Sequence, residues 1–319
     1  MKKFAVLTSG GDAPGMNAAV RAAVRKSIYH QAKIYGIRHG FLGLVQGELF
    51  PMKLSSVADI IHRGGTVLQT ARSPEFLTEE GQKKAINFLQ KEKIEGLVVI
   101  GGDGSFRGAQ VLQKAGIATV GVPGTIDNDI PITDYTIGFD TAVNTVTDAI
   151  NKVRDTATSH ERIFIIEVMG RNSGQIALHA GLAGGAESIV IPETPFNLEE
   201  VCNRLMRGVK RGKLHSVILV AEGAGGGIYV GDEIKRVTRQ EVRVMILGHL
   251  QRGGTPTAFD RILASRMGAK AIDLLLEDNS GQAIVSRNGR IEAVPYDELF
   301  ARKKEFSWDD YHLASILAI

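Results

Sequence analysis

Cysteine is almost absent from the sequence, since Cys202 is the only one among 319 residues. A single thiol cannot form a disulfide within the chain, and a lack of structural disulfides is typical of reducing compartments. The apolar run at residues 4–7 is too short for the hydrophobic segment of a signal peptide, and polar residues follow it directly. We therefore expect no cleaved leader and a cytoplasmic protein.

Long apolar runs and aromatic residues are also scarce. No stretch approaches the ~20 apolar residues of a membrane-spanning helix, so no membrane partner is expected. Aromatic residues make up 6%, and the net charge of +3 is spread along the chain except for a basic cluster at residues 207–213. Nucleic-acid-binding surfaces usually concentrate basic residues with aromatics between them. We expect no nucleic-acid partner and favour small anionic ligands.

Glycine, by contrast, is abundant, with 37 residues. Many glycines close short runs of Val, Ile and Leu, which begin at positions 4, 96, 118, 162, 187 and 216. Such runs are typical of strands buried on both faces of a parallel sheet. Helices are predicted near residues 18–28, 142–153 and 262–276, and a hairpin turn at Asn288-Gly289. This alternation predicts an α/β protein with doubly wound sheets, in which ligands bind at the carboxyl ends of the strands.

Two glycine-rich loops suit phosphate binding. GGDGS at residues 101–105 follows an apolar run and precedes a predicted helix, and SGGDAPGMN at residues 9–17 has the same character. Backbone N–H groups of such loops can surround phosphate oxygens. Asp103 would repel a bare triphosphate, whereas a bridging Mg²⁺ would make it a ligand. Neither loop matches GxxxxGK[ST] or GxGxxG, so neither a P-loop enzyme nor a standard dinucleotide enzyme is indicated.

Asp127 and Asp129 lie two apart in the segment PGTIDND. In an extended segment both carboxylates point the same way and can serve one cleft. They can form a metal site, a base beside a metal, or an ordinary turn, because Asp and Asn favour turns. Phosphoryl transfer to an alcohol needs a base, a metal and cations. The candidate cations are Arg72, Arg162, Arg171, Arg243 and Arg252.

The motifs LTSGGDAPGMNA, GGDGS, PGTIDND, MGRNSG, AEG and LGHLQRGG occur in this order. Together they resemble the bacterial ATP-dependent 6-phosphofructokinases, from the first strand to about Leu276. The resemblance implies two Rossmann-like lobes with the active site in the cleft between them. We place an ATP-binding lobe at residues 1–138 and 251–301, and a fructose 6-phosphate-binding lobe at residues 139–250 and 302–319.

The resemblance also implies the reaction and the partners. A family member transfers a phosphoryl group from MgATP to the 1-hydroxyl of fructose 6-phosphate, as the committed step of glycolysis. Mg²⁺ is the expected cofactor, and ADP and phosphoenolpyruvate are the expected allosteric effectors. Self-association as a homotetramer is expected.

Residues with roles in the chemistry follow from the matching motifs. Asp127 would be the base, with Thr125 beside the transferring phosphoryl group, and Arg72 and Arg171 would complete the catalytic set. Asp103 and Asp129 would hold the metal. The residues expected to bind ATP are Gly11, Arg72, Ser73, Gly102, Asp103, Gly104 and Ser105.

The remaining implied residues bind the sugar phosphate or an effector. Arg162 and Arg243 would reach across from a neighbouring subunit. The expected substrate-binding residues are Thr125, Ile126, Asp127, Arg162, Met169, Gly170, Arg171, Glu222, Arg243, His249, Leu250, Gln251 and Arg252. The expected effector-binding residues are Arg21, Arg25, Asp59, Arg154, Gly185, Ala186, Glu187, Arg211, Lys213, Leu214 and His215.

One departure and one possible switch concern regulation. Leu54 stands where many members carry an arginine, so weaker effector binding is expected. Glu161 and Arg162 have opposite charges, and a local rotation could exchange them beside the sugar phosphate. Such a switch needs only a few kcal/mol of ligand bias.

Three alternatives stay open. The first is a pyrophosphate-dependent enzyme. Relatives of that kind tend to carry Asp at position 104 and Lys at position 124. This chain has Gly104 and Gly124, which are expected to leave room for ATP. NAD kinases and diacylglycerol kinases share a GGDG-type loop but are not expected to have PGTIDND. A non-catalytic nucleotide-sensing protein of the same fold is the third alternative.

Overall fold

The computed structural model describes residues 1–160, 162–213 and 215–318, which form two compact units. Unit 1 comprises Met1–Ile126, Ile130–Asp140 and Arg252–Lys304. Unit 2 comprises Asp127–Asp129, Thr141–Gln251 and Glu305–Ile319. The tripeptide that contains Asp127 therefore belongs by its contacts to unit 2, although the residues on either side of it belong to unit 1.

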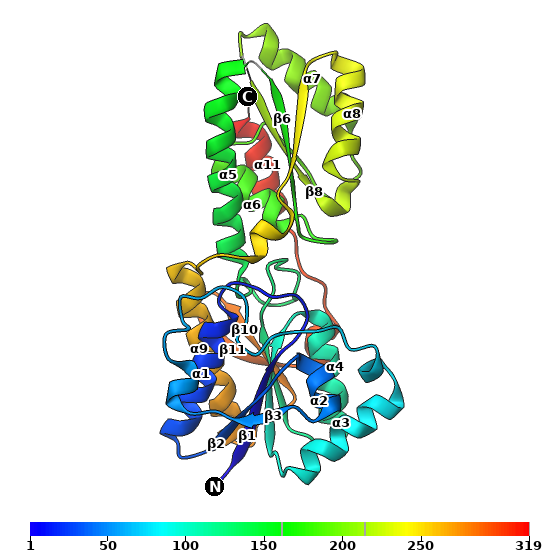
Figure 1. Cartoon of the computed structure of the whole chain (residues 1–319). Helices are drawn as coiled ribbons and strands as arrows, with labels where there is room; N and C mark the ends of the chain where they lie inside the picture. Colours follow the sequence, from blue (N-terminus) through cyan, green and yellow to red (C-terminus); the bar gives the residue numbers. More distant parts are fainter. Residues whose placement is uncertain (161, 214, 319) are drawn as a thin grey trace. The chain divides into compact units, whose positions relative to one another are not determined.

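Within the described residues, unit 1 contains a seven-stranded sheet in the order β11-β10-β5-β4-β1-β2-β3 (Figure 1). β10, β5, β4, β1 and β2 run parallel, whereas β3 and β11 are antiparallel edge strands. The strand bounds are β1 (Lys3–Thr8), β2 (Lys33–Ile37), β3 (Leu49–Pro51), β4 (Gly96–Gly101), β5 (Thr119–Pro123), β10 (Gln282–Arg287) and β11 (Arg290–Pro295).

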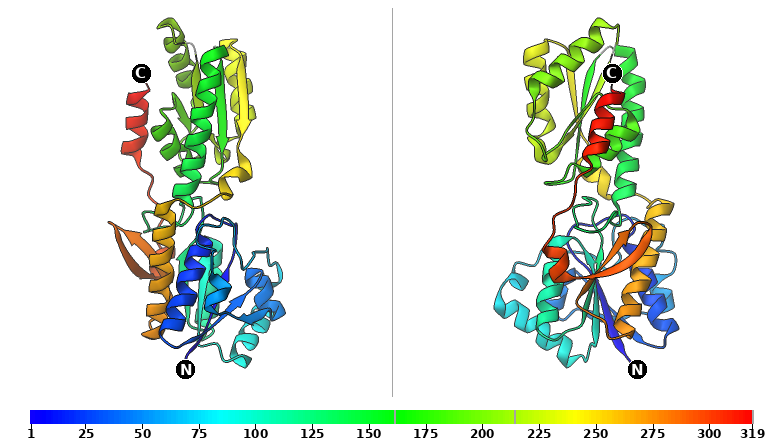
Figure 2. Two further views of the ribbon diagram at one scale, coloured as in Figure 1. Left: turned by 60° about the vertical axis from the view of Figure 1, so that its left-hand side comes forward. Right: turned by 180° about the vertical axis from the view of Figure 1, so that it is seen from behind.

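Helices cover both faces of this sheet, as the rotated views make clear (Figure 2). α1 and α9 pack against each other on one face, and α2, α3 and α4 cover the other. The central strands β4 and β5 are fully buried because both faces are covered. The helix bounds are α1 (Met16–Tyr29), α2 (Gly40–Gln46), η1 (Leu54–Val57), η2 (Glu75–Leu77), α3 (Glu79–Lys91), α4 (Asp103–Lys114), α9 (Ala258–Leu276) and α10 (Tyr296–Phe300).

In the part of the chain that the structure describes, unit 2 has a four-stranded parallel sheet in the order β7-β8-β6-β9. α5, α6 and α11 lie on one face, and α7 and α8 lie on the other (Figure 1). The strands are β6 (Ile163–Val168), β7 (Ser188–Val190), β8 (Ser216–Ala221) and β9 (Val242–Ile246). The helices are α5 (Phe139–His160), α6 (Gln175–Gly184), α7 (Leu198–Lys210), η3 (Glu222–Ala224), α8 (Gly227–Thr238), η4 (Gly248–Arg252) and α11 (Trp308–Leu317).

The predicted α/β class with two doubly wound, largely parallel sheets is confirmed. The hairpin turn is also confirmed, because Asn288 and Gly289 join β10 to β11 with φ values of 50° and 74°. Left-handed values at both turn residues match a two-residue hairpin, which explains the Asn-Gly sequence. No helix among the described residues is long and apolar enough to cross a bilayer.

Phe106 fixes α4 to the sheet that it covers. Its side chain has no solvent exposure, and its ring lies 2.7 Å from the position that a Cβ atom on Gly121 would take. We expect Phe106→Ala to lower the free energy of unfolding by about 3–5 kcal/mol, because the cavity cannot collapse. Phe259→Ala is the control, since that ring is 43% exposed. Urea unfolding followed by circular dichroism should show a much smaller loss for the control, and equal losses would contradict this packing.

Candidate active site

The GGDGS loop places an uncapped helix terminus at the carboxyl edge of the unit 1 sheet. Gly102 ends the turn after β4 and is the N-cap of α4, with no side chain capping the helix. A Cβ atom on Gly104 would meet nothing within 4 Å, so the first turn of α4 faces open space. The first N–H groups of a helix have no partner within it, and they carry partial positive charge. This terminus can therefore accept an anion such as a phosphate.

Asp103 stands at this terminus with a partner one helical turn away. Arg107 Nε donates to Asp103 Oδ2 at 2.8 Å, and the Arg107 guanidinium lies 4.5 Å from the centroid of the Phe300 ring. The Asp103 side chain is 42% exposed, so the pair is accessible to solvent. Asp103 thus has a counter-cation from its own helix.

The residues present fit a metal shared with a phosphate better than a metal held by protein alone. Among the described residues no group of three or more His, Cys, Asp or Glu side chains could enclose an ion. Mg²⁺ commonly takes one or two carboxylates, phosphate oxygens and water. Asp103 beside an open helix terminus suits that arrangement. Asp129, the second predicted ligand, is half-buried and belongs to unit 2.

Three further loops of unit 1 lie close to Gly102. Thr70 Oγ1 donates to the Gly10 carbonyl at 2.7 Å, which joins the segment before Arg72 and Ser73 to the loop after β1. A Cβ atom on Gly102 would lie 3.7 Å from the Thr125 side chain. A Cβ atom on Gly10 would lie 3.5 Å from Ser105 Oγ. The predicted ATP-binding loops therefore cluster at one edge of the unit 1 sheet.

Arg252 lies on this side as well, in unit 1. Its Nη1 donates to the Asp12 carbonyl at 3.1 Å. A Cβ atom on Gly11 would lie 2.3 Å from the same nitrogen, so a side chain there would displace the guanidinium. The sequence grouped Arg252 with the sugar-phosphate residues. The structure places its guanidinium at the glycine loop after β1.

In unit 2, a buried carboxylate meets an arginine. Asp127 is 3% exposed, and its Oδ2 lies 3.7 Å from Arg171 Nε. The Arg171 side chain is 68% exposed, so its guanidinium reaches both the buried acid and solvent. A buried carboxylate next to a guanidinium is favoured in its ionised form, because the opposite charge offsets the loss of hydration. This geometry suits a proton acceptor at the edge of a ligand site.

The loop that contains Arg171 is held through its backbone. Glu222 Oε1 accepts from Gly170 N at 3.2 Å and from Arg171 N at 2.8 Å, and Gln251 Oε1 accepts from Met169 N at 3.2 Å. Gly170 has a φ of 137°, and a Cβ atom there would lie 2.3 Å from the Ser173 carbonyl oxygen. Only glycine fits this turn. The predicted sugar-binding residues of this loop therefore share one rigid support.

Arg162 and Arg243 lie at the other end of the unit 2 sheet. Arg162 precedes β6 and Arg243 is near the start of β9, whereas Met169 follows the end of β6. Both arginines form ion pairs with Glu241, and the bond from Arg162 chiefly lowers the pKa of that carboxyl. β6 has six residues, and strands rise about 3.3 Å per residue, so roughly 17 Å separates the two ends. The two sets of predicted substrate-binding residues therefore lie at opposite ends of the unit 2 sheet. His249 and Leu250, near Gln251, are exposed.

The predicted effector residues fall into two groups. Arg21 and Arg25 on α1 and Asp59 after η1 belong to unit 1. In unit 2, Lys213 Nζ lies 2.6 Å from Glu187 Oε1, and Arg154 donates to the Gly185 carbonyl. The other described members in unit 2 are Ala186, Arg211 and His215. Leu214 and Glu161 lie outside the described residues.

Comparison with known proteins gives a consistent result. Residues 3–275 match the family model described as phosphofructokinase. The chain is 60% identical to the ATP-dependent 6-phosphofructokinase of Halalkalibacterium halodurans and 58% identical to that of Listeria welshimeri, each over 319 residues and the full length of both chains. The chain belongs to the phosphofructokinase family.

Solved phosphofructokinases share the fold. The structure of the Saccharomyces cerevisiae enzyme matches 94% of this chain with a TM-score of 0.90 and 36% identity, and the match spans 45% of the yeast chain. A pyrophosphate-dependent phosphofructokinase from Marinobacter aquaeolei matches 98% of this chain and 88% of its own, with a TM-score of 0.86 and 25% identity. Structural likeness thus extends to a pyrophosphate-dependent relative.

The two positions that are expected to distinguish ATP-dependent from pyrophosphate-dependent phosphofructokinases differ in their surroundings. Gly104 faces open space, as expected. At Gly124, however, a Cβ atom would lie 3.0 Å from Ile100 Cγ2 and 3.1 Å from Met16 Cε. A side chain at position 124 would therefore need Ile100 and Met16 to shift by a few tenths of an ångström. A longer residue there would have to displace core side chains before it could reach any ligand.

Sequence reasoning missed several supporting residues. Glu193 Oε1 accepts from Gly174 N at 2.7 Å and so holds the end of the MGRNSG loop. Glu241 pairs with two of the predicted arginines. No sequence motif marks either glutamate. Arg107, by contrast, follows Asp103 by four residues in a predicted helix, and that spacing is a recognisable signal for an ion pair.

The pKa of Glu193 gives a test of this loop support. Partial burial raises its pKa, and its Oε2 has no hydrogen-bond partner among the described residues. At a pH below the pKa of Glu193 in the unfolded chain, this carboxyl is protonated in both the folded and the unfolded state. Its burial then places no charge in the protein and costs no stability for that reason. As pH rises through the pKa of the unfolded state, the unfolded chain loses the proton first and the folded state loses stability. This loss is complete above the raised pKa of the folded state.

Glu193→Gln keeps an oxygen that can accept from Gly174 N but removes the charge. We expect the variant to gain stability relative to the parent at pH 7 and to match it near pH 4. Urea unfolding at both pH values measures the difference. A variant that is less stable at pH 7 would show that the ionised carboxylate supports the loop.

Proposed function

We propose that this chain transfers the terminal phosphoryl group of ATP to the 1-hydroxyl of fructose 6-phosphate, giving fructose 1,6-bisphosphate and ADP. The observation that carries the proposal is the buried Asp127 carboxylate beside Arg171. Full-length relatives named ATP-dependent 6-phosphofructokinase support the choice of substrates. The buried, unpaired thiol of Cys202 is compatible with a cytoplasmic setting.

The residues of unit 1 would bind and orient the nucleotide. The uncapped start of α4, from Gly102 to Ser105, would donate N–H groups to phosphate oxygens, with Arg72 stabilising charge on the transferring group. Asp103 and Asp129 would hold Mg²⁺, which when bound neutralises phosphate charge. Arg107 would then have to release Asp103.

The residues of unit 2 would bind the sugar and take its proton. Arg171 and the backbone at Met169 and Gly170 would position the sugar, since Glu222 and Gln251 fix that loop. Asp127 would accept the proton of the 1-hydroxyl as its oxygen attacks the phosphorus. Only Ile126 separates Asp127 from Thr125 in the chain. The proposed base is therefore next but one in sequence to the residue proposed to lie beside the transferring phosphoryl group.

Self-association belongs to this proposal. Arg162 and Arg243 lie at the opposite end of the unit 2 sheet from Arg171. β9 is an edge strand with exposed Val244, Met245 and Ile246, an apolar edge that another chain can cover. We propose a homotetramer in which these arginines serve a neighbouring chain's site. ADP and phosphoenolpyruvate are the proposed effectors, at the residues that include Arg21, Arg25 and Lys213.

A coupled assay for fructose 1,6-bisphosphate tests the proposed reaction. The purified protein should form this product with ATP and fructose 6-phosphate, and much more slowly with pyrophosphate. NAD and diacylglycerol as alternative acceptors should give no turnover. Nucleotide binding without product would instead indicate a sensing protein, and faster turnover with pyrophosphate would reverse the donor assignment.

Asp127→Asn keeps the shape of the side chain and removes the proposed base. We expect kcat to fall by about 10²–10⁴, because a positioned base contributes that much. Calorimetry should show that fructose 6-phosphate still binds, and the melting temperature should confirm a folded protein. Turnover within twofold of the parent would contradict the assignment.

Gly104 tests the phosphoryl donor. Gly104→Asp would place a carboxylate in the open space before α4, where it would repel a polyphosphate. We expect kcat/KM for ATP to fall at least about tenfold, since like charges brought together cost several kcal/mol. Gly104→Ala is the matched control, because a methyl group there meets no atom within 4 Å. If Gly104→Asp kept full activity with ATP, a carboxylate at position 104 would neither repel nor crowd the nucleotide, and this basis for assigning ATP as the donor would fail.

Mixed oligomers test the contribution of a neighbouring chain. Asp127→Asn and Arg243→Ala should each be nearly inactive at low fructose 6-phosphate concentration. After subunit exchange, some sites would combine Asp127 of one chain with Arg243 of another, so activity should rise well above both parents. If mixing restores nothing while exchange is verified by mass spectrometry, both residues act within one chain.

A further inference from the structure

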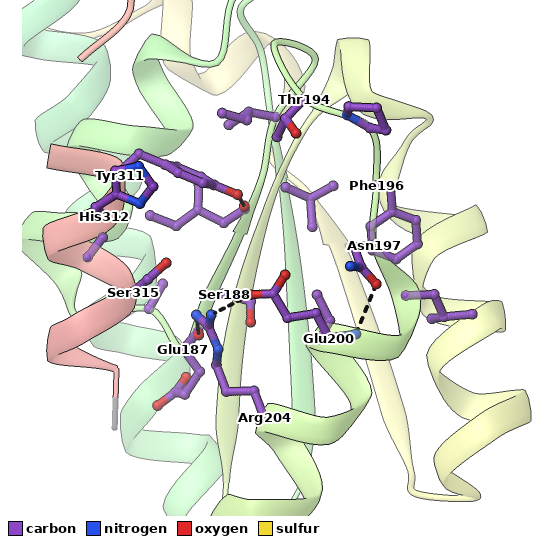
Figure 3. A pocket seen from close by; sticks show the side chains of 18 residues that line it. Glu187, Ser188, Thr194, Phe196, Asn197, Glu200, Arg204, Tyr311, His312 and Ser315 are labelled. Carbon is purple, nitrogen blue, oxygen red and sulfur yellow. Dashed lines mark hydrogen bonds and ion pairs between the residues drawn. The ribbon is translucent and has the colours of Figure 1, made fainter. Parts of the chain in front are cut away.

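The pocket between β7, α7 and α11 of unit 2 belongs to a site that is already proposed (Figure 3). Its volume is about 680 Å³, and Ala186 and Glu187 of the proposed effector set line it. A ligand bound there would therefore belong with the effectors. Unit 1 has a different feature, which neither the proposed reaction nor the proposed effector site explains. It is a long loop that buried polar side chains hold in place.

This loop leads to Arg72 and is long for a segment without regular structure. Residues 58–74 lie between η1 and η2 and contain neither a helix nor a strand. Loops of more than about 12–15 residues without regular structure are uncommon in compact domains, and they are usually either functional or disordered. This loop is anchored, because the Leu68 side chain is only 1% exposed and the Leu68 carbonyl accepts from His39 N at 3.0 Å.

Asn17, in the first turn of α1, holds the middle of the loop. Its side chain is 1% exposed, and its Nδ2 donates to the carbonyls of Arg63 and Gly64 at 3.0 and 3.2 Å. Its Oδ1 accepts from Val67 N at 2.7 Å. A side-chain amide has two N–H donors and one carbonyl acceptor. Every polar atom of the Asn17 side chain therefore bonds to the backbone of the loop.

Thr8, at the end of β1, holds the part of the loop that follows. Its side chain is fully buried, and its Oγ1 donates to the Gln69 carbonyl at 2.9 Å. Because a hydroxyl has a single hydrogen, Thr66 is the donor in the bond of 2.8 Å that joins Thr66 Oγ1 to Thr8 Oγ1. Gln69 has a φ of 60°, in the left-handed region that few residues other than glycine adopt. The bond from Thr8 therefore stabilises an unfavourable backbone conformation.

The end of the loop lies beside the proposed phosphate-binding residues. Thr70 Oγ1 donates to the Gly10 carbonyl at 2.7 Å, and a Cβ atom on Gly10 would lie 3.5 Å from Ser105 Oγ. Arg72 follows Thr70 by two residues, and two residues span at most about 7 Å. The backbone of Arg72 is therefore held close to the glycine loop after β1. The Arg72 side chain is exposed, so its position depends chiefly on this backbone.

We propose that Thr8 and Asn17 are positioning residues for Arg72. By fixing residues 63–70, they hold the arginine where it can stabilise charge on the transferring phosphoryl group. The inference rests on the proposed function, in which Arg72 has that role. A charged group contributes most to catalysis when it is held in place before the reaction begins. Neither Thr8 nor Asn17 belongs to the predicted catalytic, ligand-binding or effector-binding residues.

Thr8→Val tests this contact, because valine has nearly the shape of threonine but no hydroxyl. We expect kcat to fall at least about tenfold, since a displacement of about 1 Å can cost about 10²-fold in rate. KM for fructose 6-phosphate should change little, because the sugar is proposed to bind in unit 2. Thr8→Ser keeps the hydroxyl and should recover most of the lost kcat. Thr147→Val is the matched control, since it removes a half-buried hydroxyl that donates within α5 to the Val143 carbonyl at 2.9 Å.

A double variant separates positioning from a general loss of stability. If Thr8 acts through Arg72, Thr8→Val should lower kcat little further in a protein that already carries Arg72→Ala, because residues that act as a unit have non-additive effects. Thr66→Val removes the partner hydroxyl from the loop and leaves the core unchanged, and it should also lower kcat. This second variant keeps the test decisive if the melting temperature shows that Thr8→Val is unfolded.

Hydrogen exchange measured by mass spectrometry tests the same contact without substrates. Backbone amides of residues 63–70 should exchange faster in Thr8→Val than in the parent and in Thr8→Ser, because a segment opens more readily when its hydrogen bonds are removed. Amides of β8 in unit 2 should exchange at the same rate in all three proteins.

Three results would each overturn the inference. They are parent-like kcat in both Thr8→Val and Thr66→Val, unchanged exchange at residues 63–70, and kcat losses that multiply when Thr8→Val is combined with Arg72→Ala. Failure of the proposed function gives a different pattern, because the parent protein itself would then form no fructose 1,6-bisphosphate. An active parent with any of the three results would overturn the positioning roles of Thr8 and Asn17 alone.

Discussion

The approach of Arg171 to the buried carboxylate of Asp127 is the interaction on which the functional account depends. Asp127 is 3% exposed, and Arg171 Nε lies 3.7 Å from its Oδ2, so the opposite charge offsets part of the lost hydration of this carboxyl group. The arginine side chain is itself mostly exposed, so its position relies on its backbone. Glu222 and Gln251 fix that backbone through three N–H groups. The strength of the pair thus comes from the rigid loop beneath it.

The other proposed functional residues lie at different ends of the strands in the two units. In unit 1, the loops after β1, β4 and β5 bring together Gly11, Gly102 and Thr125, where helix termini and glycine backbones suit phosphate. In unit 2, the carboxyl ends of β6 and β8 lead to Arg171 and Glu222, which suit a sugar and its proton. The amino ends of β6 and β9 instead present Arg162 and Arg243. That separation along a strand is the reason for proposing that a neighbouring chain contributes these arginines.

The sequence predicted β1, β4, β5, β6, β7 and β8, and it missed β2, β3 and β9. β4, β5 and β8 are continuous apolar runs because helices cover both of their faces. β9 is an edge strand with mostly exposed residues, and its apolar run of Val244 to Ile246 is short and follows Arg243, so it was not recognised as a strand. The site residues were predicted from short motifs and from the family resemblance that those motifs carry. The bond from Arg252 to the Asp12 carbonyl and the contacts around Gly124 depend on residues distant in the chain, and no local pattern reports them.

The most direct test of the central interaction is a double-mutant cycle in kcat with Asp127→Asn and Arg171→Ala. If the two side chains act as one unit, the double variant should lose little more activity than Asp127→Asn alone, because groups that work together give strongly non-additive effects. Losses that multiply in the double variant would show that Asp127 and Arg171 act independently, and would contradict the account.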